Sequence, residues 1–266
     1  MRAAERPGGM CSDVMRLDVE FGWHAERVAE AGVALGLGDP VPIACRGSGH
    51  PLLLDRLAAR IGARPGLRVL DGGSGLGGPM AWLARQHGCE VVGIDVMEAA
   101  LRGARRLFPH SLVLLGSLTA LPFRAAAFEA AWTIGSLSTI PDIWTAACEL
   151  RRVLVPGGRL AVYDFVAVAG VVPDAPVANV FLRPRALTGR LRAAGFRVVA
   201  SGRAPRVGPP PAAWRDSALA VEREVALRHG RDPRYQLAVR ERAAFGRLRA
   251  SSQIAPWLLV LERPCE

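Results

Sequence analysis

Hydrophobic positions in the middle of the chain alternate between short apolar runs and longer amphipathic stretches. The apolar runs predict buried strands, at 67–71, 90–95, 111–116, 128–134 and 159–166. Between these runs, apolar residues recur every three or four positions, which predicts helices over 78–87, 97–108 and 142–154. Strands that alternate with helices in this way are typical of crossover units. We therefore expect an α/β fold whose largely parallel sheet carries helices on both faces.

Both ends of the chain carry helical patterns. Residues 1–12 resemble a loose tail, and amphipathic spacing predicts helices over 13–37 and 50–61 with a loop over 39–49 between them. After residue 166 we expect a helix over 184–194, strands over 196–201 and 257–261, and a proline-rich stretch followed by mostly helical sequence over 212–249. This pattern divides the chain into an N-terminal helical cover, 1–62, and an α/β domain, 63–266, with a helical insertion at about 205–250.

Composition narrows the class of protein. The chain has 266 residues, half of them hydrophobic, which excludes a disordered class and suffices for one well-buried domain with additions. No apolar run is long enough to span a bilayer, and the N-terminus lacks the apolar core of a secretory signal, so we expect a cytoplasmic protein without a membrane partner. The five cysteines are scattered and share no metal-ligand spacing with the histidines, so no metal is expected.

The net charge of +10 raises the question of nucleic-acid binding. Every one of the 34 basic residues is an arginine, which together with abundant Ala, Gly and Pro is typical of GC-rich codon usage. The arginines are spread along the chain, and the nearest approach to a patch lies between Arg183 and Arg249. We therefore interpret most of them as solvated helix faces, and nucleic acid is not the expected partner.

The most informative stretch runs from Arg68 to Met80, RVLDGGSGLGGPM. An apolar strand ends in Asp71, glycines follow at 72, 73, 75, 77 and 78, and a helical pattern begins after Pro79. Glycine is required where the backbone takes a positive φ or a ligand approaches the main chain closely. The helix that follows directs unpaired N–H groups at the turn. This pattern predicts a nucleotide or cofactor loop, the alternative being a glycine-rich turn without a ligand.

The same letters fit the G-x-G-x-x-G fingerprint of dinucleotide sites, in which the turn holds a pyrophosphate. Asp71 argues against that interpretation, because a carboxylate beside the turn repels two phosphates. A ligand with an ammonium or sulfonium group suits it better, and S-adenosylmethionine is such a ligand.

The segment closely resembles the first motif of the class I S-adenosylmethionine-dependent methyltransferases, a strand ending in D-x-G-x-G-x-G. A second segment, ELRRVLVPGGRL at 149–160, is similar to the family sequence that precedes the fifth strand. The details after Gly72 look most like the small-molecule members, which act on quinone precursors, sarcosine-type amines and natural products. The resemblance implies a Rossmann-like seven-stranded sheet, parallel except for one antiparallel strand, with a helical cover and a helical insertion.

The resemblance also implies which residues meet S-adenosylmethionine and its product S-adenosylhomocysteine. The acid at the end of the second strand, Asp95, is expected to bind both ribose hydroxyls, although it could also cap the next helix. The family usually has an acid after the third strand to meet the adenine amino group, and this chain has Ser117 and Leu118 instead. The full expected set is Asp71, Gly72, Gly73, Ser74, Gly75, Asp95, Val96, Met97, Ser117, Leu118, Thr133 and Gly135.

The acceptor side is less clearly marked. Many small-molecule members carry a histidine two residues before the P-D that opens the helix after strand four, and Thr139 stands there. His24 and His50 are the candidate catalytic bases, with Asp164, Tyr163 and Glu20 as further options, although each could be an ordinary surface or packing residue. Residues expected near the acceptor are Glu20, Trp23, Ser136, Thr139 and Trp214.

These patterns predict a methyltransferase for a small organic acceptor, with O-, N- or C-methylation and a role in secondary metabolism. One alternative keeps the cofactor site for another reaction, such as a cyclisation or decarboxylation, because the usual histidine is missing. The other is an RNA methyltransferase, suggested by the net charge. A homodimer is one option for the assembly.

Overall fold

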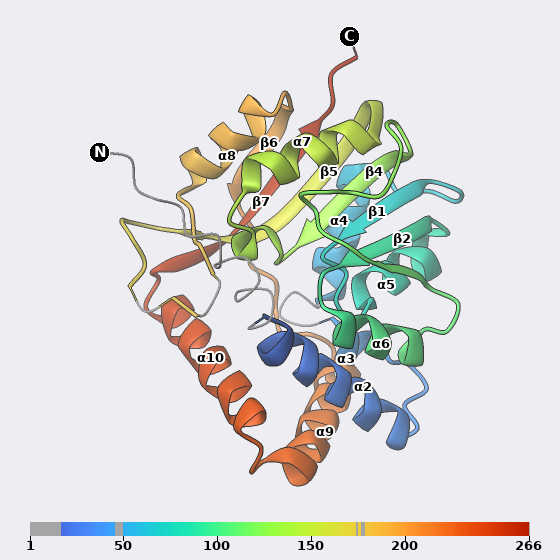
Figure 1. Cartoon of the computed structure of the whole chain (residues 1–266), viewed down its shortest axis with the longest axis vertical. Coiled ribbons are helices and arrows are strands. Elements are labelled where there is room, and N and C mark those ends of the chain that lie inside the picture. Colours follow the sequence, from blue (N-terminus) through green and yellow to red (C-terminus); the bar gives the residue numbers. More distant parts are fainter. Residues whose placement is uncertain (1–16, 46–49, 174, 177–178, 266) are drawn as a thin grey trace.

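A seven-stranded sheet forms the centre of the computed structural model, which describes residues 17–45, 50–173, 175–176 and 179–265 except the side chains of Val19 and Glu20 (Figure 1). The strand order is β3-β2-β1-β4-β5-β7-β6. The strands are β1 (Arg68–Gly72), β2 (Glu90–Asp95), β3 (Leu112–Leu115), β4 (Phe128–Ile134), β5 (Leu154–Ala167), β6 (Arg197–Arg203) and β7 (Ile254–Glu262). Strands β1 to β5 pair in parallel, and β7 runs antiparallel to β5 and β6. The fold class predicted from the sequence is confirmed.

Helices cover both faces of this sheet. One face carries α4 (Pro51–Ile61), α5 (Gly78–His87) and α6 (Glu98–Leu107), whose buried side chains Leu57, Leu83 and Leu101 pack with Trp132 of β4. The other face carries α7 (Ile143–Val153) and α8 (Pro184–Ala193), which bury Leu150 and Leu191 against Leu160 of β5. Because both faces are covered, the central strands read as apolar runs rather than as alternating patterns.

A further group of helices lies together at one end of the molecule (Figure 1). From the N-terminal part come η1 (Asp18–Gly22), α2 (Trp23–Ala34) and α3 (Val41–Ala44), and from between β6 and β7 come α9 (Ala212–His229) and α10 (Pro233–Ala250). Ala29 of α2 and Val221 and Val225 of α9 share one buried cluster with Ala100 of α6. Segments about two hundred residues apart in the sequence thus build one cover. No helix among the described residues combines the length and the apolar character needed to cross a bilayer.

Several boundaries differ from the sequence-based expectation, and two of the differences add structure that was not expected. The segment 39–49, expected as a loop, contains the short helix α3. Strand β5 begins at Leu154, five residues before the expected start, because the Pro-Gly-Gly segment continues the sheet rather than ending it. Gly157 N–H donates to the Arg263 carbonyl at 2.8 Å, and Arg263 N–H donates to the Gly158 carbonyl at 2.9 Å. This pairing uses chain more than a hundred residues away, which local pattern does not report.

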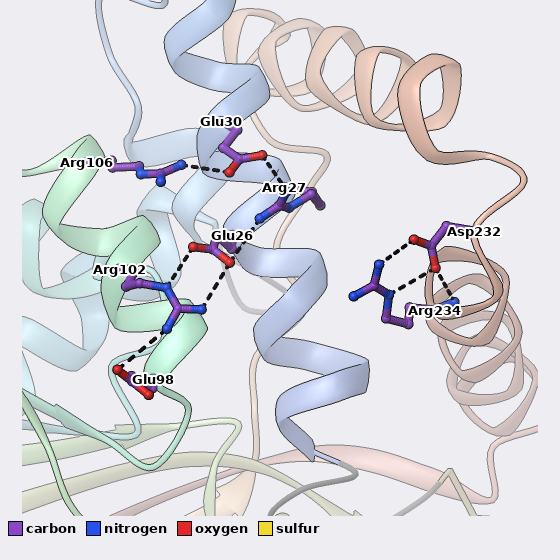
Figure 2. A network of polar contacts seen from close by, with 8 residues as sticks. All are labelled: Glu26, Arg27, Glu30, Glu98, Arg102, Arg106, Asp232 and Arg234. Atoms are coloured by element: carbon purple, nitrogen blue, oxygen red, sulfur yellow. Dashed lines mark hydrogen bonds and ion pairs between the residues drawn. The ribbon is translucent and has the colours of Figure 1, made fainter.

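A charge network fixes the N-terminal cover to the sheet domain (Figure 2). The Glu26 carboxylate of α2 is 7% exposed and accepts two bonds from Arg102 of α6, at 2.8 and 3.2 Å. Glu30, one turn further along α2, pairs with Arg106 at 2.8 Å. Hydrogen bonding to Arg102 lowers the pKa of Glu26, so the carboxylate is ionised at neutral pH and its contribution is lost as the pH falls through that lowered pKa.

Replacing Glu26 by Gln should destabilise the fold by about 1–3 kcal/mol, because the negative charge and one of the two oxygens that accept from Arg102 are lost at a nearly buried site. Glu98→Gln is the matched control: Glu98 faces the same arginine at 3.6 Å but its side chain is 65% exposed. Its loss should change the stability by less than about 0.5 kcal/mol. Urea unfolding at neutral pH measures both values, and equal effects would contradict the assignment of Glu26 as the fixed contact.

Candidate functional site

A cavity of about 570 Å³ lies between the carboxyl ends of the parallel strands and the helical cover. Gly73, Asp95, Ser117 and Gly135 line it from the ends of β1 to β4 and the turns that follow. The cover contributes side chains from η1, α2, α3, α9 and α10. In open α/β sheets, ligands bind outside the carboxyl ends of the strands, and this cavity occupies that position.

The glycine-rich turn after β1 forms one wall of the cavity. The backbone N–H groups of Gly73 and Ser74 both donate to the Ile94 carbonyl, at 2.9 and 3.1 Å, which ties the turn to the end of β2. Gly73 has φ +78°, and a Cβ atom there would lie 2.4 Å from the Ser136 Cβ, so only glycine fits. Gly75 has φ +52° and no atom within 4 Å of the position that a Cβ would take. The turn therefore leaves bare backbone facing open space.

Asp95 connects this turn to helix α6. Its Oδ2 atom accepts from Gly75 N–H at 2.8 Å, and its Oδ1 atom accepts from Met97 N–H at 2.9 Å. The residue is 5% exposed and lines the cavity. The sequence left two roles open for Asp95, ribose binding and capping of the next helix. The structure shows the contact with the helix start, and the carboxylate oxygens retain lone pairs for a ligand hydroxyl.

Asp71 lies at the end of β1 beneath the turn. It is 1% exposed, and its Oδ2 atom has no hydrogen-bond partner among the described residues. Ser74 carries a second such atom, its buried Oγ. Burial, and then the negative charge of Asp95, raise the pKa of Asp71 to about 7. The Trp132 side chain acts in the opposite direction and lowers this pKa. A carboxyl group buried to this extent is costly for the fold and typical of a ligand site.

The structure brings most of the predicted cofactor residues to one cavity. Its lining includes Gly73, Ser74, Gly75, Asp95, Val96, Met97, Ser117, Leu118 and Gly135. Asp71, Gly72 and Thr133 are not part of the described lining. The Thr133 hydroxyl is fully buried without a described partner, and a Cβ on Gly72 would contact Leu118 and Thr133.

The predicted acceptor-side residues separate into two groups. Ser136, Thr139 and His24 line the cavity. Three others do not: His50 caps α4 by accepting from Leu52 N–H at 3.2 Å, Trp214 packs edge-on against Trp82, and Trp23 packs edge-on against His229. The Glu20 side chain lies outside the described residues.

Two groups that the sequence did not single out also face the cavity: Glu222 of α9 and Arg242 of α10. Helices α9 and α10 carry charged residues on all sides, and their buried residues are Val221, Val225, Ala238 and Leu248. The sequence therefore has no apolar periodicity that would indicate which residues of these helices face the cavity. Asp164, one of the further base options, lines the cavity as well and is 1% exposed. Its oxygens accept from Ser138 N–H at 3.0 Å and Phe165 N–H at 2.7 Å.

Comparison with known proteins agrees with this geometry. Residues 70–162, which span the glycine turn, Asp95 and strands β1 to β5, match the methyltransferase domain family. Residues 70–162 thus carry a methyltransferase domain. The resemblance drawn from the two sequence motifs is thereby confirmed, and residues outside 70–162 supply most of the cover.

Among curated relatives, the methyltransferase GfsG of Streptomyces halstedii is 37% identical over 134 residues, which cover 48% of each chain. The 27-O-demethylrifamycin SV methyltransferase of Amycolatopsis mediterranei is 35% identical over 137 residues, 46% of this chain and 48% of the relative. The chain thus spans about half the length of these two relatives. Among solved structures, the [4+2]-cyclase SpnF has a TM-score of 0.64 and 24% identity over 81% of both chains, a likeness of fold.

Replacing Asp71 by Asn should change the pH dependence of stability. Because the pKa of Asp71 is about 7 in the fold and 3.8 in the reference, folding takes up a proton between these values, and the wild type loses stability as the pH rises. The free energy of unfolding of Asp71→Asn relative to wild type should therefore grow by about 2–3 kcal/mol from pH 5 to pH 8. Urea unfolding of the ligand-free protein tests this, and a pH-independent difference would show that Asp71 is not the responsible group.

Proposed function

We propose that this methyltransferase domain uses S-adenosylmethionine to methylate a small organic acceptor in secondary metabolism. The observation that carries the proposal is the pair of buried carboxyl groups, Asp71 and Asp95, on either side of a glycine turn. A pyrophosphate at this turn would meet both negative charges, whereas a zwitterionic amino acid end with a sulfonium would find acceptors for its positive groups.

The residues present fit such a cofactor. Ser74, whose buried Oγ has no described partner, and the bare backbone at Gly75 line the cavity, and the buried carboxyl group of Asp71 lies beneath this turn. Asp95 would hold the ribose hydroxyls, and Met97 and Leu118, which line the same cavity, would flank the adenine ring. When bound, S-adenosylmethionine supplies an activated methyl group, so the protein has mainly to position the acceptor and exclude water.

The charges around the cavity favour a small, largely apolar acceptor over RNA. Among the described lining residues, Asp95, Asp164, Glu222 and Glu241 are acidic, and Arg242 is the one arginine. A polyanion would be repelled from this lining despite the net charge of +10 of the whole chain. The names of the curated relatives, which include a rifamycin methyltransferase, support a natural-product acceptor.

Asp164 is the residue that we propose as general base for an acceptor that must lose a proton. Burial raises the pKa of Asp164, which makes its carboxylate a better proton acceptor near neutral pH, and two backbone N–H groups fix its orientation. By contrast, His50 acts as a helix cap, and the Nε2 atom of His24 lies 3.0 Å from Arg242 Nη2.

Calorimetry with S-adenosylhomocysteine tests the cofactor assignment. Wild type should bind it, and Asp95→Asn should weaken binding by about 10–100-fold, because an amide nitrogen replaces one of the two oxygens that accept from the ribose and from Gly75. The matched control is Asp216→Asn, an exposed aspartate on α9, which should bind like wild type. Binding of a nicotinamide dinucleotide in place of S-adenosylhomocysteine would overturn the proposal.

The base assignment has a separate test. Purified protein is incubated with S-adenosylmethionine and a panel of hydroxylated natural products, and mass spectrometry identifies the methylated product. With that acceptor, Asp164→Asn should lower kcat by about 10²–10⁴-fold while the Kd for S-adenosylhomocysteine stays within about twofold of wild type. An unchanged kcat would exclude Asp164 as the base.

A second candidate function is a reaction other than methylation at the same cofactor site, such as a cyclisation. Thr139 occupies the position where many small-molecule members carry histidine, and this observation favours it. Turnover of an acceptor without gain of a methyl group would support this second function, and detection of a methylated product would exclude it.

A further inference from the structure

Three polar side chains from distant parts of the sequence meet at the cover side of the cavity. Arg242 of α10 donates from Nη1 to Glu222 Oε1 of α9 at 2.7 Å, and its Nη2 lies 3.0 Å from His24 Nε2 of α2. All three residues line the cavity. His24 is 1% exposed.

The surroundings of this cluster are apolar. Phe21, Val28, Ala218, Val221 and Phe245 line the same side of the cavity, from η1, α2, α9 and α10. Charged groups beside such a surface cost desolvation free energy unless they have partners or a ligand. Burial acts to raise the pKa of Glu222, but its contacts with His24 and Arg242 lower it to about 2, so this carboxylate is ionised at neutral pH.

The hydrogen bonds leave Arg242 with capacity for a ligand. His24 Nε2 also lies 3.6 Å from Glu222 Oε1, so the imidazole ring contacts both charged side chains. A guanidinium has five N–H donors, and the described contacts of Arg242 use two of them. Its side chain remains 41% exposed. Because it is held between Glu222 and His24, the guanidinium is positioned in advance for an oxygen atom in the cavity.

The charge balance indicates which oxygen. Glu222 offsets the charge of Arg242, and the other acidic residues in the described lining, Asp95, Asp164 and Glu241, oppose an anionic ligand. We propose that Arg242, held by Glu222 and His24, donates hydrogen bonds to a neutral carbonyl or hydroxyl oxygen on an otherwise apolar acceptor. This inference rests on the proposed function, because it assumes that the cavity holds a small organic acceptor.

Three probes of matched shape test the proposal on protein saturated with S-adenosylhomocysteine: 2-acetylnaphthalene, 2-isopropylnaphthalene and 2-naphthoic acid. In wild type, calorimetry or ligand-observed NMR should show that the ketone binds about tenfold more tightly than the hydrocarbon, as expected for one hydrogen bond to a charged donor. Arg242→Met should reduce this preference to less than about threefold. Arg240→Met, an exposed arginine on the same helix outside the cavity lining, is the matched control and should keep it.

Two further arms keep the result decisive. Arg242→Lys retains the charge and the stem but lacks the forked donors, so it should lose most of the preference and serves if the Met variant folds poorly. A ketone preference that persists in both variants, or is absent from wild type, would overturn the proposal. So would tightest binding of the naphthoic acid, which would indicate a carboxylate acceptor. Loss of S-adenosylhomocysteine binding in wild type would instead contradict the proposed function.

Discussion

The site is organised by the electrostatic cost of two carboxyl groups buried next to one glycine turn. Asp71 and Asp95 are almost inaccessible, and the negative charge of Asp95 adds to the burial that raises the pKa of Asp71 to about 7. The backbone offsets only part of this electrostatic cost, because the N–H groups of Gly75 and Met97 donate hydrogen bonds to Asp95. A ligand with positive charge and hydroxyl groups removes the remainder. The buried carboxyl groups therefore make the ligand-free state less stable and the cofactor site more selective.

The cover over this site is held by charge as much as by apolar packing. Helices α9 and α10 bury few side chains, and their inward contacts include Glu222 and Arg242, which meet His24 from α2. On its other side α2 is fixed to α6 through Glu26 and Arg102 (Figure 2). Ionic and hydrogen-bonded contacts specify orientation better than apolar surfaces do. These contacts fix the orientation of the cover on the sheet.

Much of the fold followed from local pattern. The apolar runs and the helical spacings placed strands β1 to β4, the end of β5 and the helices between them within a few residues, because central strands and their crossover helices have strong periodic signals. The glycine turn was equally clear from the sequence. Gly73 and Gly75 have positive φ, and few residues other than glycine adopt that conformation. The early start of β5 was missed, because it depends on pairing with Arg263 far along the chain.

The sequence by itself determined the central strands, the glycine turn and the acids beside it, because the pattern that marks each of them lies within a few residues of chain. Only the tertiary structure decided which cover residues reach the cavity. In the structure His50 caps a helix, and Trp23 and Trp214 pack against other aromatic rings. Arg242 lies next to His24, although the two are 218 residues apart in the sequence. The physical reason is that the sequence of a charged helix with weak apolar periodicity does not show which face will be buried. That face is defined only when another element packs on it.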